Sequence, residues 1–497
     1  MLNKQKTIRL SPYSDLYDIL VKPDNRYRRF HDEVDFTFVR EALAGRYSEF
    51  MGKTAVDPVV LIKCLIIKEI TEFSDRDLME EVRVNMAYKY FLDMLPEQEP
   101  FDASLLSYFR RKRLRGCDLL GTLLGQSLQL ALEKGVLKRG NNGKVVVTVA
   151  VDSTHTESLG RVLLPREGIA HFCNKLSKAI RDSYGLGFDQ WGQAPVFANT
   201  EEAVAYARAL LSRALAEFPD CRVSGKTRLY YNRLEEALED IADHGSCSAS
   251  DRDARTGHKN AASHFEGYKS HIMTDVDSGL VLGAAVTSGE VSDTPVGEHL
   301  VDELIQSDDL ELERLIGDGS YGSTAMMKKA RHDSFDLVAT ANPMLGSSQS
   351  RYQQKGFTYN KDADMLVCPA GHMAVSSCVR HYKHEDNRTV RMFYFDVDRC
   401  RNCSNREGCY KAGAKSKSYS VTILTDLQKE YISKTKTPQF REHFRKRTAA
   451  ERTNAELKRG RGLRKARYYG LEMMTVQAAV ALFTYNLKKI LCPKSRK

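Results

Sequence analysis

The amino-acid sequence predicts an α/β protein, in which a mixed sheet flanked by helices follows a helical N-terminal domain and is interrupted by insertions. Three observations predict this class. Apolar residues recur at helical spacing within residues 57–95. A β-branched run at 143–154 opens a stretch in which strand and helix patterns alternate. Five of the 11 cysteines fall within residues 368–409, which marks one insertion as cysteine-rich.

The first 140 residues predict mostly helices. Asp57-Pro58 is typical of a helix start, because the aspartate caps backbone N–H groups and proline fits the first turn. Ser74 offers a second N-cap, and a third helical region runs from about Ala103 to Leu137. Short, partly basic helices are typical of a DNA-binding module and also of a plain helical bundle, and the pattern leaves both open.

The strand patterns begin after an Asn-Asn-Gly turn. The run GKVVVTVAVDST at 143–154 predicts a buried strand with Asp152 at its end. Asp277-Ser278-Gly279 lies between two apolar runs and predicts a hairpin turn. Another strand leads into Gly317-Asp318-Gly319 and a helix, and FDLVATAN at 335–342 predicts one more strand. Strands that alternate with helices favour a layered α/β core.

The charge of the chain is unevenly distributed. Its 75 Lys and Arg against 65 Asp and Glu leave a formal net charge of +10. Residues 411–497 alone hold 22 Lys and Arg and six Asp and Glu, a net charge of +16, so that the first 410 residues carry −6. An enzyme of small metabolites has little need for such asymmetry, whereas a protein that binds a polyanion does.

The sequence does not indicate a membrane or secreted protein. No stretch approaches 18 uninterrupted apolar residues, and the N-terminal segment lacks a continuous apolar region followed by a small-residue cleavage site. We therefore expect a cytoplasmic protein, in which the cysteines do not imply a disulfide framework.

Three carboxylates stand where they can converge. Asp152 ends one buried-type strand, Asp318 follows another, and Glu451 lies in a basic helical segment. Three carboxylates at one point repel one another unless a cation lies among them. Mg²⁺ (or Mn²⁺) suits such a site because it prefers hard oxygen ligands, and two ions about 3.5–4 Å apart can act on a phosphodiester. Taken singly, each residue also has an ordinary explanation as a turn former, a helix cap or half of a surface ion pair.

The helix around Glu451 carries cations on the same face. Arg447 lies four residues before the glutamate and Lys458 seven after it, offsets that fall on one helical stripe. Cations there can hold a DNA backbone, although ordinary i,i+4 pairing explains Arg447 equally well. Glu456 follows Arg452 at the same spacing, but no lysine follows seven residues later, and this favours Glu451.

This stripe resembles the signature Tyr-x2-Arg-x3-Glu-x6-Lys of one large group of DDE transposases from bacterial insertion sequences. The match reads Phe444-x2-Arg447-x3-Glu451-x6-Lys458, with phenylalanine in place of tyrosine. The substitution removes one hydroxyl group and leaves the other three positions intact. The following block GLRKARYYGL, residues 462–471, is similar to the tail that follows the glutamate in this family.

Other segments extend the resemblance over most of the chain. VAVDSTHTES around Asp152 and IGDGSYGS around Asp318 are similar to the two aspartate motifs of the family. Residues 267–294 resemble the hairpin between them, with its trailing Val-x-Asp. Residues from about 31 to 113 resemble the helical domain at the front of such transposases.

The resemblance implies an RNase H-like catalytic core in which Asp152, Asp318 and Glu451 are the catalytic residues and hold Mg²⁺ or Mn²⁺. It implies an enzyme that cuts DNA at the ends of an element and joins the freed 3′-hydroxyl to target DNA. The expected partners are terminal inverted repeats, target DNA and further copies of the chain, as a homodimer or larger assembly at the bacterial nucleoid. The predicted DNA-binding residues are Arg447, Lys458, Arg459, Arg461, Arg464, Lys465 and Arg467.

Two other functions stay open at this stage. One is a transposase-derived, sequence-specific DNA-binding protein without catalysis, which would keep the basic C-terminal part. The other is an RNase H-like repair or recombination nuclease without strand transfer.

The cysteine-rich segment has the residues for one zinc site. Cys400 and Cys403 form a CxxC pair, and Cys368 and Cys409 complete four candidate ligands. The spacing is not a clean pair of CxxC motifs, so free thiols in a β-rich insertion are the alternative.

These patterns divide the chain into five regions. They are a helical N-terminal DNA-binding or transposase domain at 1–140, the first part of the core at 141–155 and 256–345, a mostly helical insertion at 156–255 with helices at 198–218 and 226–243, a β-rich cysteine-containing insertion at 346–437, and basic helices at 438–497 that complete the core.

Overall fold

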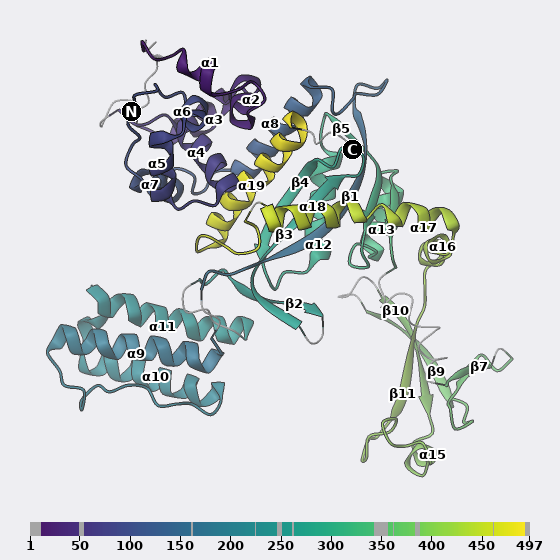
Figure 1. Ribbon diagram of the computed structural model, residues 1–497. Helices are drawn as coiled ribbons and strands as arrows, with labels where there is room; N and C mark the ends of the chain where they lie inside the picture. The colour runs from purple at the N-terminus through teal and green to yellow at the C-terminus, as the bar shows by residue number, and fades with distance from the viewer. Residues whose placement is uncertain are drawn as a thin grey trace.

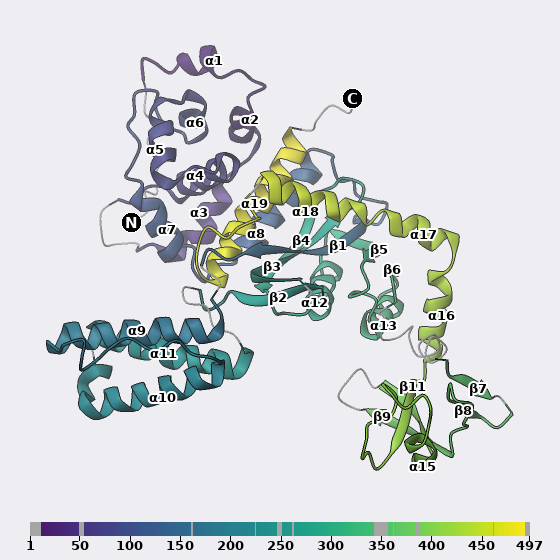
Figure 2. The ribbon, with the colours of Figure 1, turned by 60° about the horizontal axis from the view of Figure 1, so that its bottom comes forward.

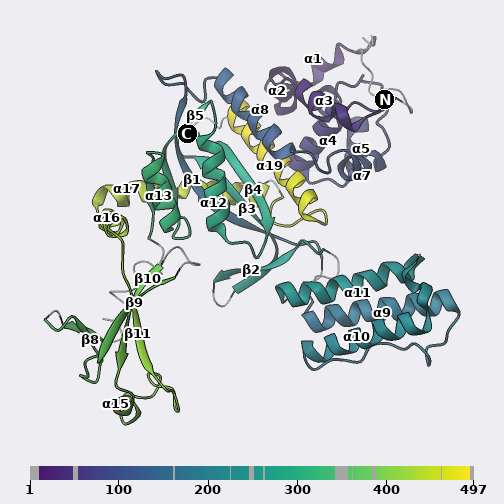
Figure 3. The ribbon, with the colours of Figure 1, turned by 180° about the vertical axis from the view of Figure 1, so that it is seen from behind.

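The computed structural model describes residues 11–48, 54–160, 163–223, 225–245, 251–260, 263–341, 356–360, 362–382, 388–460 and 462–492. Figure 1 shows a helical N-terminal part, a sheet with helices on both faces, a bundle of three helices and a small β part. The bundle and the small β part project away from the sheet in every view (Figures 1, 2 and 3).

The N-terminal part consists of short helices, as the sequence predicts. They are α1 (Leu16–Leu20), α2 (Arg26–Glu33), α3 (Thr37–Leu43), α4 (Pro58–Thr71), α5 (Asp75–Val84), α6 (Met86–Phe91), α7 (Ser104–Lys112) and α8 (Leu119–Glu133). Both predicted caps are confirmed. The side chain of Asp57 accepts a hydrogen bond from the N–H of Val59, and Ser74 forms a reciprocal capping box with Asp77.

The central sheet is mixed, with β1 at its middle. Its strands are β1 (Val145–Glu157), β2 (Arg255–Asn260), β3 (Ser263–Asp275), β4 (Val281–Ser288), β5 (Leu310–Gly317) and β6 (Asp336–Ala339). The order is β2-β3-β1-β5-β6, with β4 also paired to β3. β1 is antiparallel to β3 and parallel to β5, and β5 is parallel to β6. This arrangement matches the predicted RNase H-like core.

The predicted hairpin between β3 and β4 is confirmed. The N–H of Gly279 donates to the carbonyl oxygen of Asp275 at 2.9 Å, and Gly279 adopts a positive φ of 70° that favours glycine. The carboxylate of Asp275 accepts hydrogen bonds from the N–H and hydroxyl of Ser278 and so closes the turn.

Helices cover both faces of the sheet. α12 (Asp293–Ile305) and α13 (Thr324–His332) lie on one face, whereas α17 (Pro438–Arg445) and α18 (Thr448–Gly460) cross the other (Figures 1 and 3). Ala450 of α18 and Phe440 of α17 pack on Ala150, Ile316 and Val338 of the three parallel strands. Residues of α18 are therefore held over the middle of β1, near Asp152.

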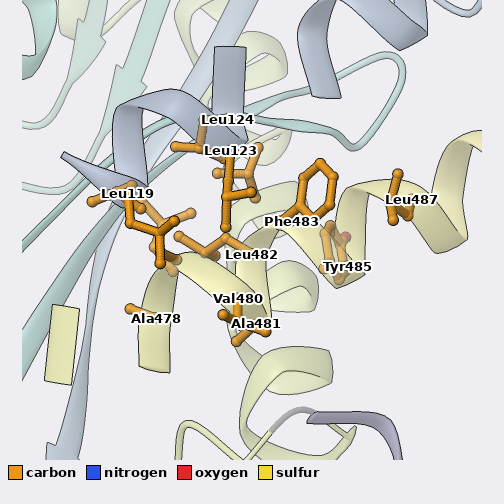
Figure 4. Packing of buried hydrophobic residues seen from close by; sticks show 14 of the residues in the cluster. Leu119, Leu123, Leu124, Ala478, Val480, Ala481, Leu482, Phe483, Tyr485 and Leu487 are labelled. Atoms are coloured by element: carbon orange, nitrogen blue, oxygen red, sulfur yellow. The ribbon is translucent and has the colours of Figure 1, made fainter. Parts of the chain in front are cut away.

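The last helix, α19 (Leu471–Leu491), docks on the core, as its apolar stripe predicts. It lies beside α8 and against β4, and Figure 4 shows Leu119, Leu123 and Leu124 of α8 facing Leu482 and its neighbours on α19. Burial of a leucine side chain of this kind contributes roughly 1.5–3 kcal/mol. Helix α19 thus joins the N-terminal helices to the sheet in one hydrophobic core.

The first insertion is a helical bundle with its own core. It comprises α9 (Pro165–Tyr184), α10 (Thr200–Glu217) and α11 (Gly225–His244). The sequence predicts α10 and α11, whereas α9 is an additional helix. The core includes Trp191, Ile180, Leu210 and Leu234, none of which belongs to the main core.

The second insertion is a small β part followed by a helix. It contains β7 (Thr358–Asn360), β8 (Met365–Val367), β9 (Ser376–Tyr382), β10 (Arg388–Phe395), α15 (Val397–Arg401), β11 (Lys417–Thr422) and then α16 (Asp426–Thr435). β11, β10 and β9 form a three-stranded antiparallel sheet. The hydroxyl of Tyr431 on α16 bonds both the N–H and the carbonyl oxygen of Ala339 on β6, so α16 already packs on the core before Pro438. In the described part of the chain, no helix is long and apolar enough to cross a membrane.

Candidate active site

Asp152 and Asp318 lie at corresponding positions on adjacent parallel strands. Ala150 of β1 pairs in register with Ile316 of β5, and each aspartate stands two residues further along its chain. The predicted strand end at Asp152 is wrong, because β1 continues to Glu157 in its pairing with β3; both aspartates instead follow the last pair of the parallel β1–β5 ladder. Strand register therefore brings together two carboxylates that are far apart in the sequence.

The Asp152 carboxyl is half-buried and held in a mixed electrostatic environment. Burial, together with a smaller effect of the neighbouring Asp318 carboxylate, raises its pKa to about 6. The Arg447 guanidinium and hydrogen bonds from Asn454 and the Ser153 backbone oppose this rise. The carboxyl group is thus costly to ionise in the protein alone, and a cation at this edge would favour the ionised form.

Glu451 lies on α18, the helix whose Asn454 contacts Asp152. The helix begins at Thr448, so Glu451 lies in its first turn and Arg447 immediately precedes the helix. A guanidinium nitrogen of Arg447 lies 2.5 Å from a carboxylate oxygen of Glu451, whose side chain is 47% exposed. Because Arg447 also lowers the pKa of Asp152, its guanidinium interacts with both carboxylates. Glu456, the alternative glutamate, pairs instead with Lys488 of α19 at 3.2 Å.

Asn454 is a site residue that the sequence reasoning missed. Its side-chain nitrogen donates to a carboxylate oxygen of Asp152 at 3.0 Å, across 302 positions of the chain. It lies three residues after Glu451 and four before Lys458, on the same helical stripe. The helical spacing could have placed Asn454 on this face, but only the docking of α18 shows that it contacts Asp152.

Phe444 packs beside Arg447. It stands where the transposase signature that this segment resembles has a tyrosine. Its ring stacks on Phe440 with centroids 5.9 Å apart, and the Arg447 guanidinium lies 5.9 Å from the Phe444 ring centre. The phenylalanine therefore keeps a packing role next to the carboxylates.

The basic residues after Glu451 divide into three groups. Lys458 approaches the ring of His155 on β1, with its ammonium nitrogen 3.3 Å from Nδ1. Arg459, Arg464 and Lys465 are exposed, and Arg461 lies outside the described residues. Arg467 has its guanidinium 2.8 Å from the buried carboxylate of Glu69 on α4, so the structure places it in a contact with the N-terminal part.

The exposed cations are fixed beside the end of β1. The N–H of Glu157, the last residue of β1, donates to the carbonyl oxygen of Arg464 at 3.1 Å. The carbonyl oxygen of Glu157 accepts the N–H of Ala466 at 2.8 Å. The segment thus extends the sheet locally and presents Arg464 and Lys465 on the strand that also carries Asp152.

Tyr321 packs against the glycine that precedes Asp318. Its ring is 1% exposed and fills a slot formed by Gly297 of α12 and Gly317 of β5, where any Cβ atom would collide with the ring. Burial and the nearby carboxylates of Asp293, Asp318 and Asp152 raise its pKa well above the usual value. The glycine before Asp318 is thus required by this packing, in addition to the turn.

The donor set fits a hard divalent cation. Asp152, Asp318 and Glu451 offer only carboxylate oxygens, and the side-chain oxygen of Asn454 is buried without a hydrogen-bond partner among the described residues. Within those same residues, no group of three or more His, Cys, Asp or Glu side chains stands in a metal-holding arrangement. The ion pair of Glu451 with Arg447 is the contact that a cation would have to replace.

The four cysteines predicted to bind zinc lie far along the chain from this edge and line one cavity of about 310 Å³ in the small β part. Burial and the proximity of Cys409, Cys368 and Cys403 raise the pKa of the Cys400 thiol. The fifth cysteine, Cys378, contacts the hydroxyl of Tyr394 on the β9–β10 ladder at 3.6 Å instead.

Comparisons with known proteins match two segments of the chain to transposase domains. A family model described as a transposase domain (DUF772) matches residues 15–112, and one described as a transposase DDE domain matches residues 367–491. Glu451 lies in the second match, and Asp152 and Asp318 lie between the two. No match was found among curated proteins. A solved structure, described as a piggyBac transposase synaptic complex with hairpin DNA, is similar at 10% identity with a TM-score of 0.34, over 96% of this chain and 76% of that chain.

The fold is a mixed sheet flanked by helices with a helical front, and both family matches describe transposase domains. These two matches support a DDE transposase of the insertion-sequence type, and a transposase DDE domain implies a DNA endonuclease and strand transferase. A DDE domain implies a divalent metal ion, usually Mg²⁺ or Mn²⁺.

Proposed function

We propose that Asp152, Asp318 and Glu451 form the catalytic triad of this transposase and hold Mg²⁺ or Mn²⁺. The observation that supports the proposal is the register of β1 with β5, which brings Asp152 close to Asp318 and to the Arg447 guanidinium that pairs with Glu451. Bound ions would polarise a phosphodiester and activate water or a 3′-hydroxyl.

The residues around the triad have distinct tasks in this proposal. Asn454 orients Asp152 through its 3.0 Å hydrogen bond and leaves the other carboxylate oxygen available. Arg447 pairs with Glu451 in the absence of metal and DNA. When both bind, the Arg447 guanidinium leaves this carboxylate and pairs with a phosphate oxygen instead. Tyr321 fills the space behind the Asp318 turn and excludes water from that side.

The DNA path follows the cations at the end of β1. We propose that Lys458, Arg459, Arg464 and Lys465 contact the DNA backbone, because they belong to α18 or to the segment that pairs with Glu157. Arg447, which immediately precedes α18, joins them. Arg461 and Arg467 were predicted for the same surface. Arg467 is engaged by Glu69, so its proposed DNA contact requires that ion pair to open.

The substrate proposal is the end of the mobile element. The enzyme would nick at the terminal inverted repeats and join the freed 3′-hydroxyl to target DNA, working at the bacterial nucleoid. Two ends must be held at once for this reaction, which favours a dimer or larger assembly on DNA.

The experiment uses purified full-length protein, Mg²⁺ and a DNA fragment that carries the sequences flanking the gene. We expect nicking at the element ends and joined products. Asp318→Ala should lower both by at least about 100-fold while the protein still binds the fragment, because the metal ligand is lost and the cations remain. Glu303→Ala, an exposed carboxylate on α12, is the matched control.

Each other result has a definite meaning. Nicking by Asp318→Ala at the wild-type rate would refute the triad. Nicking without joining would assign the core to a nuclease, and DNA binding without nicking in either protein would assign it to a DNA-binding protein.

A further inference from the structure

We propose that the small β part is a zinc-binding module, in which Cys368, Cys400, Cys403 and Cys409 hold one structural Zn²⁺ ion. All four side chains line a single cavity of about 310 Å³. A four-coordinate Cys₄ site is the usual arrangement for structural zinc, with Zn–S distances of about 2.3 Å. The site is separate from the acidic edge of the sheet and does not depend on the proposed triad.

The backbone bends around this cavity at each cysteine. The N–H of Cys368 donates to the carbonyl oxygen of His372 and the N–H of Gly371 to that of Cys368, both at 2.8 Å, and Gly371 has a φ of 82°. This closes a tight turn that only glycine completes easily at that position. The first cysteine therefore sits at the tip of a turn, as the ligands of zinc ribbons do.

The other three cysteines lie in a segment of successive four-residue turns, each closed by a hydrogen bond between residues three positions apart. The N–H of Cys403 donates to the carbonyl oxygen of Cys400 at 3.4 Å, that of Arg406 to Cys403 at 3.2 Å, and that of Cys409 to Arg406 at 3.0 Å. Successive turns of this kind keep the segment wrapped around one point. Cys400, Cys403 and Cys409 are thereby held on the same cavity as Cys368.

Several groups around the cavity can stabilise negative charge on sulfur, although burial and the neighbouring cysteines raise the pKa of the Cys400 thiol. The N–H of Asn405 donates to the sulfur of Cys403 at 3.4 Å, a contact that stabilises negative charge on sulfur. Lys417 and Arg406 line the cavity as cations. Phe357, Phe395 and Tyr419 line its apolar side, with the rings of Phe357 and Tyr419 stacked at 4.4 Å. Cations and an apolar wall together suit a metal bound by thiolates.

The module also lacks a core large enough to be stable by itself. Its buried apolar cluster holds only Phe357, Leu366, Ala374, Phe393 and Phe395 among the described residues. Small domains with so little buried surface are commonly stabilised by a metal or by disulfides. A metal that joins the turn at Cys368 to the segment 400–409 would connect the two ends of this cluster.

One rearrangement is required. Among the described residues, no three metal-binding side chains converge on one point. To bind zinc, the four cysteine side chains must therefore rotate so that their thiols face the cavity. Cys400 lies in the short helix α15 and the other three cysteines lie on turns, all outside the ladder of β9, β10 and β11; three of the four are half-buried while Cys409 is exposed. Their side chains can therefore rotate without breaking backbone pairing.

The first experiment measures metal in the full-length protein, purified with reductant and without chelator. We expect about one Zn²⁺ per chain by mass spectrometry of the elements. Exchange of zinc for Co²⁺ should produce the absorption bands of a tetrahedral thiolate site, a result that needs no variant to fold. A protein that binds less than about 0.2 Zn²⁺ per chain after incubation with zinc, or that gives no such bands with Co²⁺, would overturn the proposal.

Variants test the ligand set. The double variant Cys400→Ser, Cys403→Ser should lose at least about 80% of the zinc, whereas Cys378→Ser, which alters the cysteine paired with Tyr394, should retain it. His372 lines the same cavity, so His372→Ala should leave the Co²⁺ bands unchanged. A change in those bands would replace the Cys₄ set by one that includes histidine, against the proposal.

The zinc result is independent of the catalytic one. Asp318→Ala should keep its zinc, because that carboxylate is not among the proposed ligands. Loss of nicking with zinc retained therefore supports both proposals, and wild-type nicking by a zinc-free protein would overturn the structural role of the metal alone.

Discussion

At the scale of single residues, the ionised carboxylate of Asp152 is electrostatically unfavourable in the folded protein. Its carboxyl group is half-buried beside Asp318, and its pKa rises from 3.8 to about 6. A carboxyl whose pKa is higher in the folded state binds protons more tightly there than in the unfolded chain. The folded state is therefore penalised as the pH rises between about 4 and 6, and the penalty is complete above this window.

We therefore predict that Asp152→Asn makes the metal-free protein more stable at pH 8. The change removes a charge that is costly to keep near Asp318, and the expected gain in unfolding free energy is about 1–2 kcal/mol. Denaturant unfolding in the presence of a chelator measures it. The gain should shrink towards zero at pH 4, where the wild-type carboxyl is protonated in the folded state; a variant that is less stable than wild type at pH 8 would contradict the account.

Asn454 gives a second prediction at this scale. Asn454→Ala removes the hydrogen bond to Asp152 and should lower the nicking rate about 10- to 100-fold, as loss of a residue that orients a metal ligand commonly does. A positioning role also predicts that more Mg²⁺ is needed for half-maximal activity. An unchanged Mg²⁺ requirement in a folded variant would show that Asn454 acts only in packing.

At the scale of elements, buried ion pairs connect the N-terminal helices to one another. The carboxylate of Asp75, at the start of α5, pairs with Lys68 of α4 and accepts two hydrogen bonds from Arg110 of α7, at 2.5 and 3.1 Å. The side chains of Lys68 and Arg110 are only 10% and 7% exposed. These cations hold the pKa of Asp75 below its usual value despite its burial.

We predict that Asp75→Asn destabilises the protein by about 3 kcal/mol at pH 7, because two buried cations lose their carboxylate. Since the pKa of Asp75 is lowered on folding, this stabilisation is present above about pH 4 and is lost as the pH falls below that value. The difference between variant and wild type in denaturant unfolding should therefore shrink in acid. Glu80→Gln on the exposed face of the same helix is the control and should change stability by less than about 0.5 kcal/mol.

At the scale of the whole molecule, the helical insertion is a separate folding unit attached to the sheet. Its core of Trp191 and its neighbours shares no residue with the main core. The connection to the sheet includes ion pairs of Asp240 on α11 with Arg252 and with Arg255 of β2, at 3.1 and 2.9 Å.

We predict that residues 163–245 fold when expressed alone. The isolated segment should show a helical circular dichroism spectrum and one cooperative thermal transition, because its apolar face is already buried within the bundle. Trp191→Ala should lower its stability by about 3–5 kcal/mol and abolish the transition at moderate temperature. A gradual melt in the unmodified segment would show that it requires the sheet.

The site was predictable in part because its signals are local. A β-branched run indicates a strand, and a stripe at offsets of four and seven indicates a helix face. The strand with Asp152 and the stripe from Arg447 to Lys458 follow from these periodicities, whereas the predicted strand end at Asp152 was wrong, because β1 continues to Glu157. Asn454 lies on the same stripe but has no chemistry of its own, so only its neighbour in space identifies it.

Arg467 illustrates the opposite limit. Its sequence context, a dense basic segment, predicts DNA contact, yet its guanidinium lies against Glu69, 398 positions away in the chain. Composition measures how much charge a segment carries and says nothing of the partner that each cation finds. Helix α9 was missed for a simpler reason: its apolar residues have helical spacing, but they begin within a segment that reads as polar insertion.

The sequence by itself determined most elements of this protein, the caps at Asp57 and Ser74, and the placement of its positive charge in the last part of the chain. These properties depend on neighbours within a few residues, through helical and strand periodicity. The tertiary structure alone decided that Asp152 meets Asp318 and Asn454, that Arg447 interacts with two carboxylates, and that four cysteines line one cavity. Those contacts depend on strand order, register and the docking of α18, which join segments hundreds of residues apart and which no local pattern encodes.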